Sequence, residues 1–219
     1  MREPTLVPAG EVADGDVAPF GILSTTERFR GHVISVYTDD VRMPGGGSAE
    51  RDIVRHPGAV GIVALDDDER VLLVQQYRHA VRRHLWEPPA GLLDVEGERA
   101  DVTAARELYE EAGYRAARWD VLVDLYQTPG GSDEALRLFL ARDLTPVEPA
   151  DRFLGEHEEA DMPLSWVPIE TAVDLVFSGR LHNCAAVAGI LALAAARSRG
   201  WTGLRPADAR WPERPAHSS

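Results

Sequence analysis

The apolar residues of this chain fall into short continuous runs separated by polar turns, a pattern that predicts strands and helices in alternation. Residues 60–65 and 71–77 are rich in Val, Ile and Leu and lie on either side of an acidic turn at residues 66–70. Strands that are apolar along their whole length are typically buried on both faces, so we expect these two runs to form a buried hairpin. Residues 20–56 predict further strands around a Gly-rich turn at residues 43–48.

The segment after this hairpin is expected to be extended at first and then helical. Residues 86–91 contain two adjacent prolines, which disfavour a helix. Residues 100–112 predict a helix, with Asp101 or Thr103 near its start and Gly113 as its stop. The two strands expected next lie at residues 119–126 and 136–140.

The C-terminal part predicts two helices. They lie at residues 170–177 and 183–198, and Asn183 has a side chain suited to capping the second one. An apolar run of 13 residues, 184–196, is too short to span a bilayer and indicates a buried helix. Cys184 begins this run, so we expect it to be an inert core residue.

The length of 219 residues suits one domain with extensions. We expect an N-terminal antiparallel β extension over residues 1–57, a central α/β domain over residues 58–200 and a C-terminal tail over residues 201–219. Residues 1–18 and 205–219 are rich in Pro and charged residues, and we expect both to be loosely ordered.

The net charge of −13 repels nucleic-acid backbones and anionic membranes, so we expect neither as a partner. An anionic substrate would then be attracted by local Arg residues or by a metal ion rather than by the overall field. Cys184 is the single cysteine, which rules out an intramolecular disulfide. Together with an N-terminus that lacks a signal pattern, this predicts a cytoplasmic location.

The strongest chemical signal is the acidic run within the helix predicted for residues 100–112. Glu107, Glu110 and Glu111 follow an i, i+3, i+4 pattern, so on a helix they share one face. Like charges this close cost stability unless a cation lies among them. Hard carboxylate oxygens suit Mg²⁺ or Mn²⁺ better than zinc. The alternative is a solvated acidic helix with an Arg106–Glu110 pair.

This run resembles the signature of the Nudix hydrolases, Mg²⁺-dependent enzymes that cleave nucleoside diphosphates linked to another group. The family pattern is Gly, five residues, Glu, seven residues, then Arg-Glu-aliphatic-x-Glu-Glu-x-Gly-aliphatic. The matching residues here are Glu98, Arg106, Glu107, Leu108, Glu110, Glu111 and Gly113. One extra residue separates Gly91 from Glu98, and Tyr114 replaces the final aliphatic residue. The resemblance implies a Nudix-type α/β/α sandwich around a mixed β-sheet.

Residues outside the signature resemble the ADP-ribose pyrophosphatase branch of this family, and its actinobacterial members in particular. The similar segments are residues 41–47, 75–79, 85–92, 128–134 and 157–162. The resemblance implies hydrolysis of the pyrophosphate bond of ADP-ribose to AMP and ribose 5-phosphate, with Mg²⁺, or Mn²⁺, as cofactor. In this branch the N-terminal strands exchange between two subunits, so the resemblance also implies a homodimer.

The same resemblance assigns roles around the metal. It implies that the carbonyl of Ala90 and the carboxylates of Glu107 and Glu111 hold the ions, with Glu111 bridging more than one. Glu110 is expected to be a supporting group. Arg106 is expected to pair with a neighbouring carboxylate, Glu98 among them, and to fix the geometry of the helix.

The general base is expected on a different segment, one able to reach the attacking water from outside the crowded metal site. The acidic loop at residues 156–159 supplies the candidates. The resemblance favours Glu159, with Glu158 as the second choice.

Four residues are candidates for binding the substrate. Arg78 offers planar, bidentate donors for a phosphate, and Arg51 is expected to do the same across the dimer. Glu134 is placed to accept from ribose hydroxyls, and Leu92 to flank the substrate. Trp86 has either this flanking role or a place in the core.

Two alternatives stay open at this point. One keeps the fold but changes the substrate to another nucleoside diphosphate sugar or an oxidised nucleotide. The other is a non-catalytic sensor of ADP-ribose, which normally loses carboxylates of the signature and carries a DNA-binding module. The retained Glu107, Glu110 and Glu111 and the charge of −13 argue against the sensor.

Overall fold

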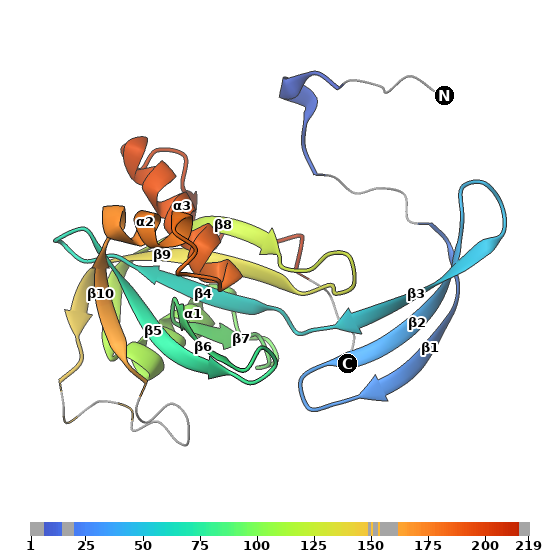
Figure 1. Ribbon diagram of the computed structural model, residues 1–219, viewed down its shortest axis with the longest axis horizontal. Coiled ribbons are helices and arrows are strands. Elements are labelled where there is room, and N and C mark those ends of the chain that lie inside the picture. Colours follow the sequence, from blue (N-terminus) through green and yellow to red (C-terminus); the bar gives the residue numbers. More distant parts are fainter. Residues whose placement is uncertain (1–6, 15–19, 149, 151–152, 154–161, 215–219) are drawn as a thin grey trace.

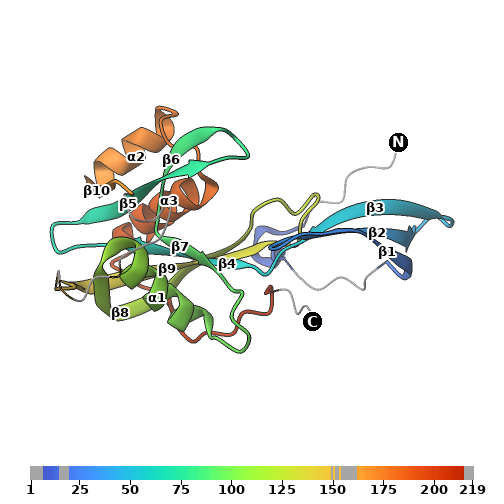
Figure 2. The same ribbon diagram turned by 90° about the horizontal axis from the view of Figure 1, so that it is seen from below.

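The computed structural model describes residues 7–14, 20–148, 150, 153 and 162–214, and it divides into an N-terminal sheet and an α/β unit (Figure 1). The N-terminal sheet has the antiparallel order β1-β2-β3. In both ribbon views it projects from the α/β unit as an arm (Figures 1 and 2). Its strands are β1 (Ile22–Arg30), β2 (Ser35–Arg42) and β3 (Ser48–Arg55), preceded by a short 3-10 helix at Ala9–Glu11.

The α/β unit contains two more sheets. One has the strand order β11-β8-β9-β4-β7, and it is mixed because β4 runs parallel to β9 while the other neighbours are antiparallel. The other has the antiparallel order β10-β5-β6. The strands are β4 (Ala59–Ala64), β5 (Arg70–Arg78), β6 (Arg83–Glu87), β7 (Ala90–Leu92), β8 (Tyr114–Tyr126), β9 (Ala135–Pro146), β10 (Leu164–Pro168) and β11 (Arg205–Pro206). The helices are α1 (Ala100–Ala112), α2 (Ile169–Phe177) and α3 (Cys184–Ser198).

The alternation of side chains along β4 explains the layers. Val60 and Ile62 point into a core cluster that includes Leu108 of α1. Val63 points into a different cluster, which is built with residues of α2 and α3 such as Ile190. Since β4 is completely buried, each face of the five-stranded sheet is covered by helix. The expected α/β/α sandwich around a mixed sheet is therefore confirmed.

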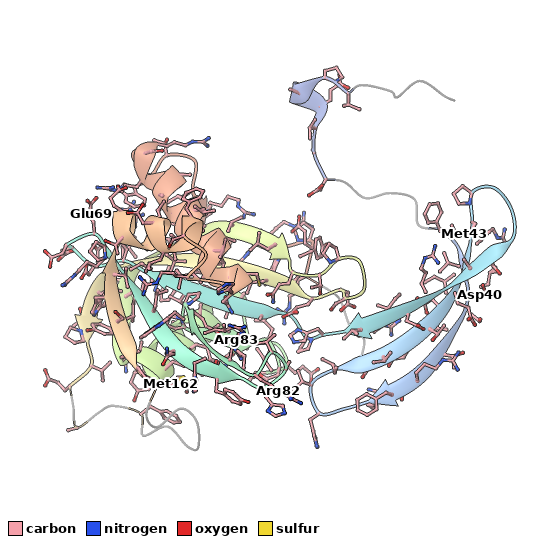
Figure 3. All side chains as sticks on the ribbon, in the orientation of Figure 1. Asp40, Met43, Glu69, Arg82, Arg83 and Met162 are labelled. Atoms are coloured by element: carbon pink, nitrogen blue, oxygen red, sulfur yellow. The ribbon has the colours of Figure 1, made fainter. Side chains whose placement is uncertain are left out.

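The expected hairpin of residues 60–65 and 71–77 is wrong. The chain does turn back between β4 and β5, but the two strands share only an isolated bridge between Leu65 and Val71 and then enter different sheets. Each is a central strand with partners on both of its edges. The apolar residues on both faces of each run therefore correctly predicted that the strands are buried, but they did not predict which strands pair with them. Figure 3 shows Glu69 at this turn, where its Oε1 accepts a 2.7 Å hydrogen bond from Arg197 of α3.

The expectation of a loose tail fails for residues 205–214. β11 pairs with β8, and Trp211 packs against the core cluster of α1. Arg137 explains why residues 205–214 have a defined structure. Its side chain is buried, at 2% exposed, and Asp124 alone does not satisfy its hydrogen-bond donors. Its Nη1 donates to the carbonyl of Ala209 at 2.7 Å and its Nη2 to that of Arg210 at 3.2 Å.

The helix ends largely follow the sequence. Gly113 ends α1 in the left-handed region at φ 68°, and Asn183 caps α3 by accepting from Ala186 N at 3.0 Å. Neither Asp101 nor Thr103 caps α1, because Arg99 holds the N-cap position without a side-chain bond. The expected burial of Cys184 is wrong, since the residue as a whole is exposed at the first turn of α3, although partial burial of its thiol raises the pKa of that group. In the described residues no helix is long and apolar enough to cross a membrane.

Candidate active site

The helix α1 presents its acidic side chains around one guanidinium. Arg106 Nη1 donates to Glu107 Oε1 at 2.7 Å and to Glu110 Oε2 at 3.1 Å, while its Nη2 donates to Glu98 Oε2 at 3.2 Å. The repulsion expected among the carboxylates is thus offset by Arg106. Burial disfavours the charged guanidinium, but the hydrogen bonds to Glu98 and Glu110 and the charge of Glu107 raise the pKa of Arg106 above its ordinary value.

Glu98 is fixed by two donors from α1. The hydroxyl of Thr103 reaches its Oε2 at 2.8 Å, and Arg106 reaches the same oxygen. These two hydrogen bonds, with that of Thr103 the stronger influence, lower the pKa of Glu98. The loop before α1 is therefore tied to the helix despite its extra residue.

The strand β7 brings backbone atoms next to these carboxylates. Glu111 Oε2 accepts from the backbone N–H of Ala90 at 2.9 Å. The carboxylate of Glu107 lies so close to Gly91 that a Cβ at that position would overlap it. Ala90, Glu107 and Glu111, the three residues expected to hold the metal, therefore converge on one point.

The donor set at this point fits a hard divalent cation, because it combines two carboxylates with a backbone segment that offers carbonyl oxygen. Within the part of the chain that the structure describes, no group of three or more His, Cys, Asp or Glu side chains is arranged to hold a metal. Arg106 pairs instead with three of the carboxylates, those of Glu98, Glu107 and Glu110.

Arg78 is held by a buried carboxylate. Its Nε and Nη2 donate to the two oxygens of Glu87 at 2.9 and 2.7 Å, and Glu87 is only 3% exposed. Glu87 precedes the Pro88–Pro89 pair that leads into β7, so Arg78 is connected through Glu87 to the strand that contains Ala90. Glu87 was not among the predicted site residues, although an acidic residue next to Trp86 at the end of a partly apolar strand was a signal for it.

Leu92 and Glu134 lie at the same end of the five-stranded sheet. Leu92 pairs with Ala59 at the start of β4, and Ala59 pairs in turn with Leu136 at the start of β9. Glu134 stands immediately before β9, where its Oε1 accepts from Gln127 Nε2 at 2.6 Å. Gln127 was also missed, because only the folded loop reveals this pairing.

One expected site residue, Arg51, is not next to the carboxylates. Arg51 lies on β3 of the projecting sheet, exposed, with its Nη1 donating to the carbonyl of Glu50. Glu158 and Glu159, the candidates for the general base, lie outside the described residues.

Comparison with known proteins identifies the family of this chain. A family model described as the NUDIX domain matches residues 55–183, which is more than half of the chain. This chain therefore belongs to the Nudix family, as the spacing of its carboxylates had indicated.

Two of its relatives within this family are named ADP-ribose pyrophosphatases. The chain is 47% identical over 196 residues to the ADP-ribose pyrophosphatase of Mycobacterium tuberculosis (strain ATCC 25618 / H37Rv). The aligned region covers 90% of this chain and 93% of that protein. The chain is 39% identical over 155 residues to the ADP-ribose pyrophosphatase of Bacillus subtilis (strain 168), covering 71% and 82% respectively. Among solved structures, one described as an ADP compounds hydrolase has a TM-score of 0.70 at 22% identity, covering 86% of this chain and 100% of that one.

Proposed function

We propose that this Nudix hydrolase cleaves the pyrophosphate bond of ADP-ribose to give AMP and ribose 5-phosphate. The observation that carries the proposal is the convergence of Glu107 and Glu111 of α1 on the backbone of Ala90. Two relatives that bear the name ADP-ribose pyrophosphatase support the choice of substrate.

In this proposal the carboxylates of Glu107 and Glu111 and the carbonyl of Ala90 hold Mg²⁺, which Mn²⁺ can replace. When bound, such ions neutralise charge on the diphosphate and lower the pKa of a bound water. Arg106 holds Glu107 in place beside Gly91. It acts through that carboxylate and does not touch the substrate.

The substrate is oriented by groups on three segments. Arg78, whose guanidinium is fixed by the buried Glu87, binds a phosphate as a preorganised donor. Glu134 accepts hydrogen bonds from ribose hydroxyls, and Leu92 packs against the substrate. Glu159, or Glu158 as the second choice, takes the proton from the attacking water.

We further propose a homodimer in which residues 1–57 exchange between subunits and Arg51 reaches the partner's site. The support is that β1 is exposed along its whole length. The apolar side chains exposed on or beside this sheet are Phe20, Ile22, Leu23, Phe29, Val33 and Ile34. Light scattering of the purified chain tests the proposal: twice the chain mass of 24.0 kDa supports it, and the chain mass alone contradicts it.

We also propose the boundaries of the domain and the cellular location. The Nudix domain spans residues 58–200, and residues 201–219 form a C-terminal tail. The single cysteine suits a reducing compartment, so we place the enzyme in the cytoplasm. Fractionation of cells that express the native protein tests this placement.

The function is tested by release of AMP from ADP-ribose with Mg²⁺, compared with GDP-mannose and 8-oxo-dGTP as competing substrates. Removal of metal with EDTA and the variant Glu111→Gln are both expected to abolish release. Glu159→Gln is expected to lower kcat by about 10²–10⁴-fold, the usual contribution of a general base. Faster hydrolysis of another substrate would overturn the choice of ADP-ribose, and tight binding without hydrolysis would favour a sensor.

A further inference from the structure

A chain of polar contacts runs from the thiol of Cys184 to the proposed ribose ligand. The thiol of Cys184, at the start of α3, lies in close contact with Gln127 Oε1. Gln127 lies directly after β8, and its Nε2 donates to Glu134 Oε1 at 2.6 Å. His56, in the segment between β3 and β4, approaches the same carboxylate oxygen at 3.7 Å.

The chemistry of the partners fixes the orientation of the Gln127 amide. A carboxylate only accepts hydrogen bonds, so the NH₂ group must face Glu134. The carbonyl oxygen then faces Cys184, whose thiol is a donor. Rotating the amide by half a turn would place two acceptors against each other, so this chain of contacts has one satisfied arrangement.

The backbone of the loop before Glu134 is held by hydrogen bonds with Val54, but the side-chain carboxylate of Glu134 accepts its hydrogen bond from Gln127. Residues 128–131 are exposed and include Gly130 and Gly131. A backbone hydrogen bond of 3.3 Å from Gln127 N to the carbonyl of Glu134 closes the loop. Of the two oxygens of Glu134, hydrogen bonds from the described residues reach only Oε1.

His56 Nδ1 does not compete with Gln127 as a hydrogen-bond donor to Glu134. The backbone N–H of Gly58 donates to His56 Nδ1 at 3.1 Å, so that nitrogen acts as an acceptor. Its separation of 3.7 Å from Glu134 is also too long for a hydrogen bond. Gln127 is thus the donor that orients the carboxylate.

We propose that Gln127 is a positioning residue that holds Glu134 Oε1 and so aims Oε2 at the vicinal hydroxyls of a ribose, and that the thiol of Cys184 holds Gln127 in turn. The inference rests on the proposed function, because it takes Glu134 as the ribose ligand. It adds a residue that acts on substrate affinity without touching the substrate. It also makes Cys184 a point at which thiol modification weakens binding.

Steady-state kinetics with ADP-ribose separate this role from a structural one. Gln127→Ala is expected to raise KM roughly tenfold to a hundredfold, the value of a hydrogen bond to a charged group, with kcat within about twofold. Gln127→Glu keeps the size of the side chain but loses the donor, so it is expected to raise KM as well. Thr128→Ala, in the same loop, is the control and is expected to match the unmodified protein.

The outcomes are distinct. If the unmodified protein hydrolyses ADP-ribose and Gln127→Ala leaves KM unchanged, the proposed function stands and the positioning role is wrong. If both Gln127 variants lower kcat rather than raise KM, the residue acts on the chemistry or the fold instead. If another ribose-containing nucleotide is the substrate, the same comparison with that substrate decides the question. Analogues that lack the hydroxyls of one ribose identify the diol, because the penalty of Gln127→Ala is expected to vanish with the matching analogue.

The role of the thiol has its own test, since the chain contains a single cysteine. Alkylation with N-ethylmaleimide, followed by mass spectrometry, labels Cys184 alone. The adduct is expected to raise KM as Gln127→Ala does, and bound AMP or ribose 5-phosphate is expected to slow labelling. Cys184→Ser lacks the thiol and is the control: its KM, whatever its value, is expected to be the same with and without the reagent. Unchanged kinetics of the fully labelled protein would remove Cys184 from the proposal.

Discussion

The carboxylate of Glu107 occupies the space that a side chain at position 91 would need, because a Cβ built on Gly91 overlaps its Cγ, Cδ and Oε1. This contact explains why a glycine stands at the start of the Nudix signature in this chain. The side chain of Glu107 on α1 therefore lies directly against Gly91 of β7. Glu107, a proposed metal ligand, can therefore take this position only because residue 91 of the signature has no side chain.

Gly91→Ala is therefore expected to displace Glu107 and to lower kcat by about 10²-fold, the cost of misplacing a catalytic group by roughly 1 Å. Gly45→Ala is the matched control, because a Cβ at Gly45 meets nothing within 4 Å. Both are measured as AMP release at saturating Mg²⁺. Activity of Gly91→Ala equal to that of the control would show that Glu107 moves aside without consequence.

Arg106→Lys is expected to weaken Mg²⁺ binding or activity by about 10–100-fold, the typical effect of losing a group that orients metal ligands. A lysine keeps the positive charge but lacks the fork that reaches Glu98, Glu107 and Glu110 together. The measurement is the Mg²⁺ concentration required for half-maximal activity. Arg99→Lys is the control, since Arg99 makes an exposed pair with Asp101.

Much of the site could be predicted because its geometry is local. The spacing of Glu107, Glu110 and Glu111 fixes their shared face once the helix forms, and the left-handed Gly113 that ends it at φ 68° was visible in the sequence. The pairing of Arg106 with its neighbours follows from the same spacing.

The rest depends on contacts between distant parts of the chain. The apolar runs around residues 66–70 showed that both strands were buried, but partner choice is decided by the whole sheet. Cys184 lies in an apolar run, yet its position at the first turn of α3 turns it outward. Arg137 holds the C-terminal segment through the carbonyl of Ala209, 72 residues further along the chain. No local sequence pattern predicts such a contact.

The lowered pKa of Glu98 predicts a dependence of stability on pH. A carboxylate whose pKa is lower in the folded state contributes stability that is fully present above its unfolded pKa of 4.5 and is lost as the pH falls through its folded pKa. Glu98→Gln is therefore expected to be less stable than the unmodified protein at pH 7, and this difference is expected to shrink below about pH 4.5. Urea unfolding across this range checks it, and a difference independent of pH would contradict it.

Arg137→Ala is expected to destabilise the protein by about 3–5 kcal/mol, the usual cost of removing one partner from a buried ion pair. The change leaves Asp124 with Arg205 as its remaining partner and frees the carbonyls of Ala209 and Arg210. The free energy of unfolding in urea is the measurement. Arg210→Ala is the control: its exposed side chain should matter little, within about 0.5 kcal/mol, because only its carbonyl contacts Arg137.

The contact between Arg137 and Trp211 predicts that their substitutions do not have additive effects on the free energy of unfolding. If Arg137 stabilises the fold partly by anchoring the tail, then Trp211→Ala should cost less in the Arg137→Ala background than in the unmodified protein, because Trp211 packs against that guanidinium at 4.7 Å. A double-mutant cycle measures this difference. Strictly additive losses would mean that the tail is held by the pairing of β11 with β8 and by the core contacts of Trp211 alone, and that Arg137 serves only to pair with Asp124.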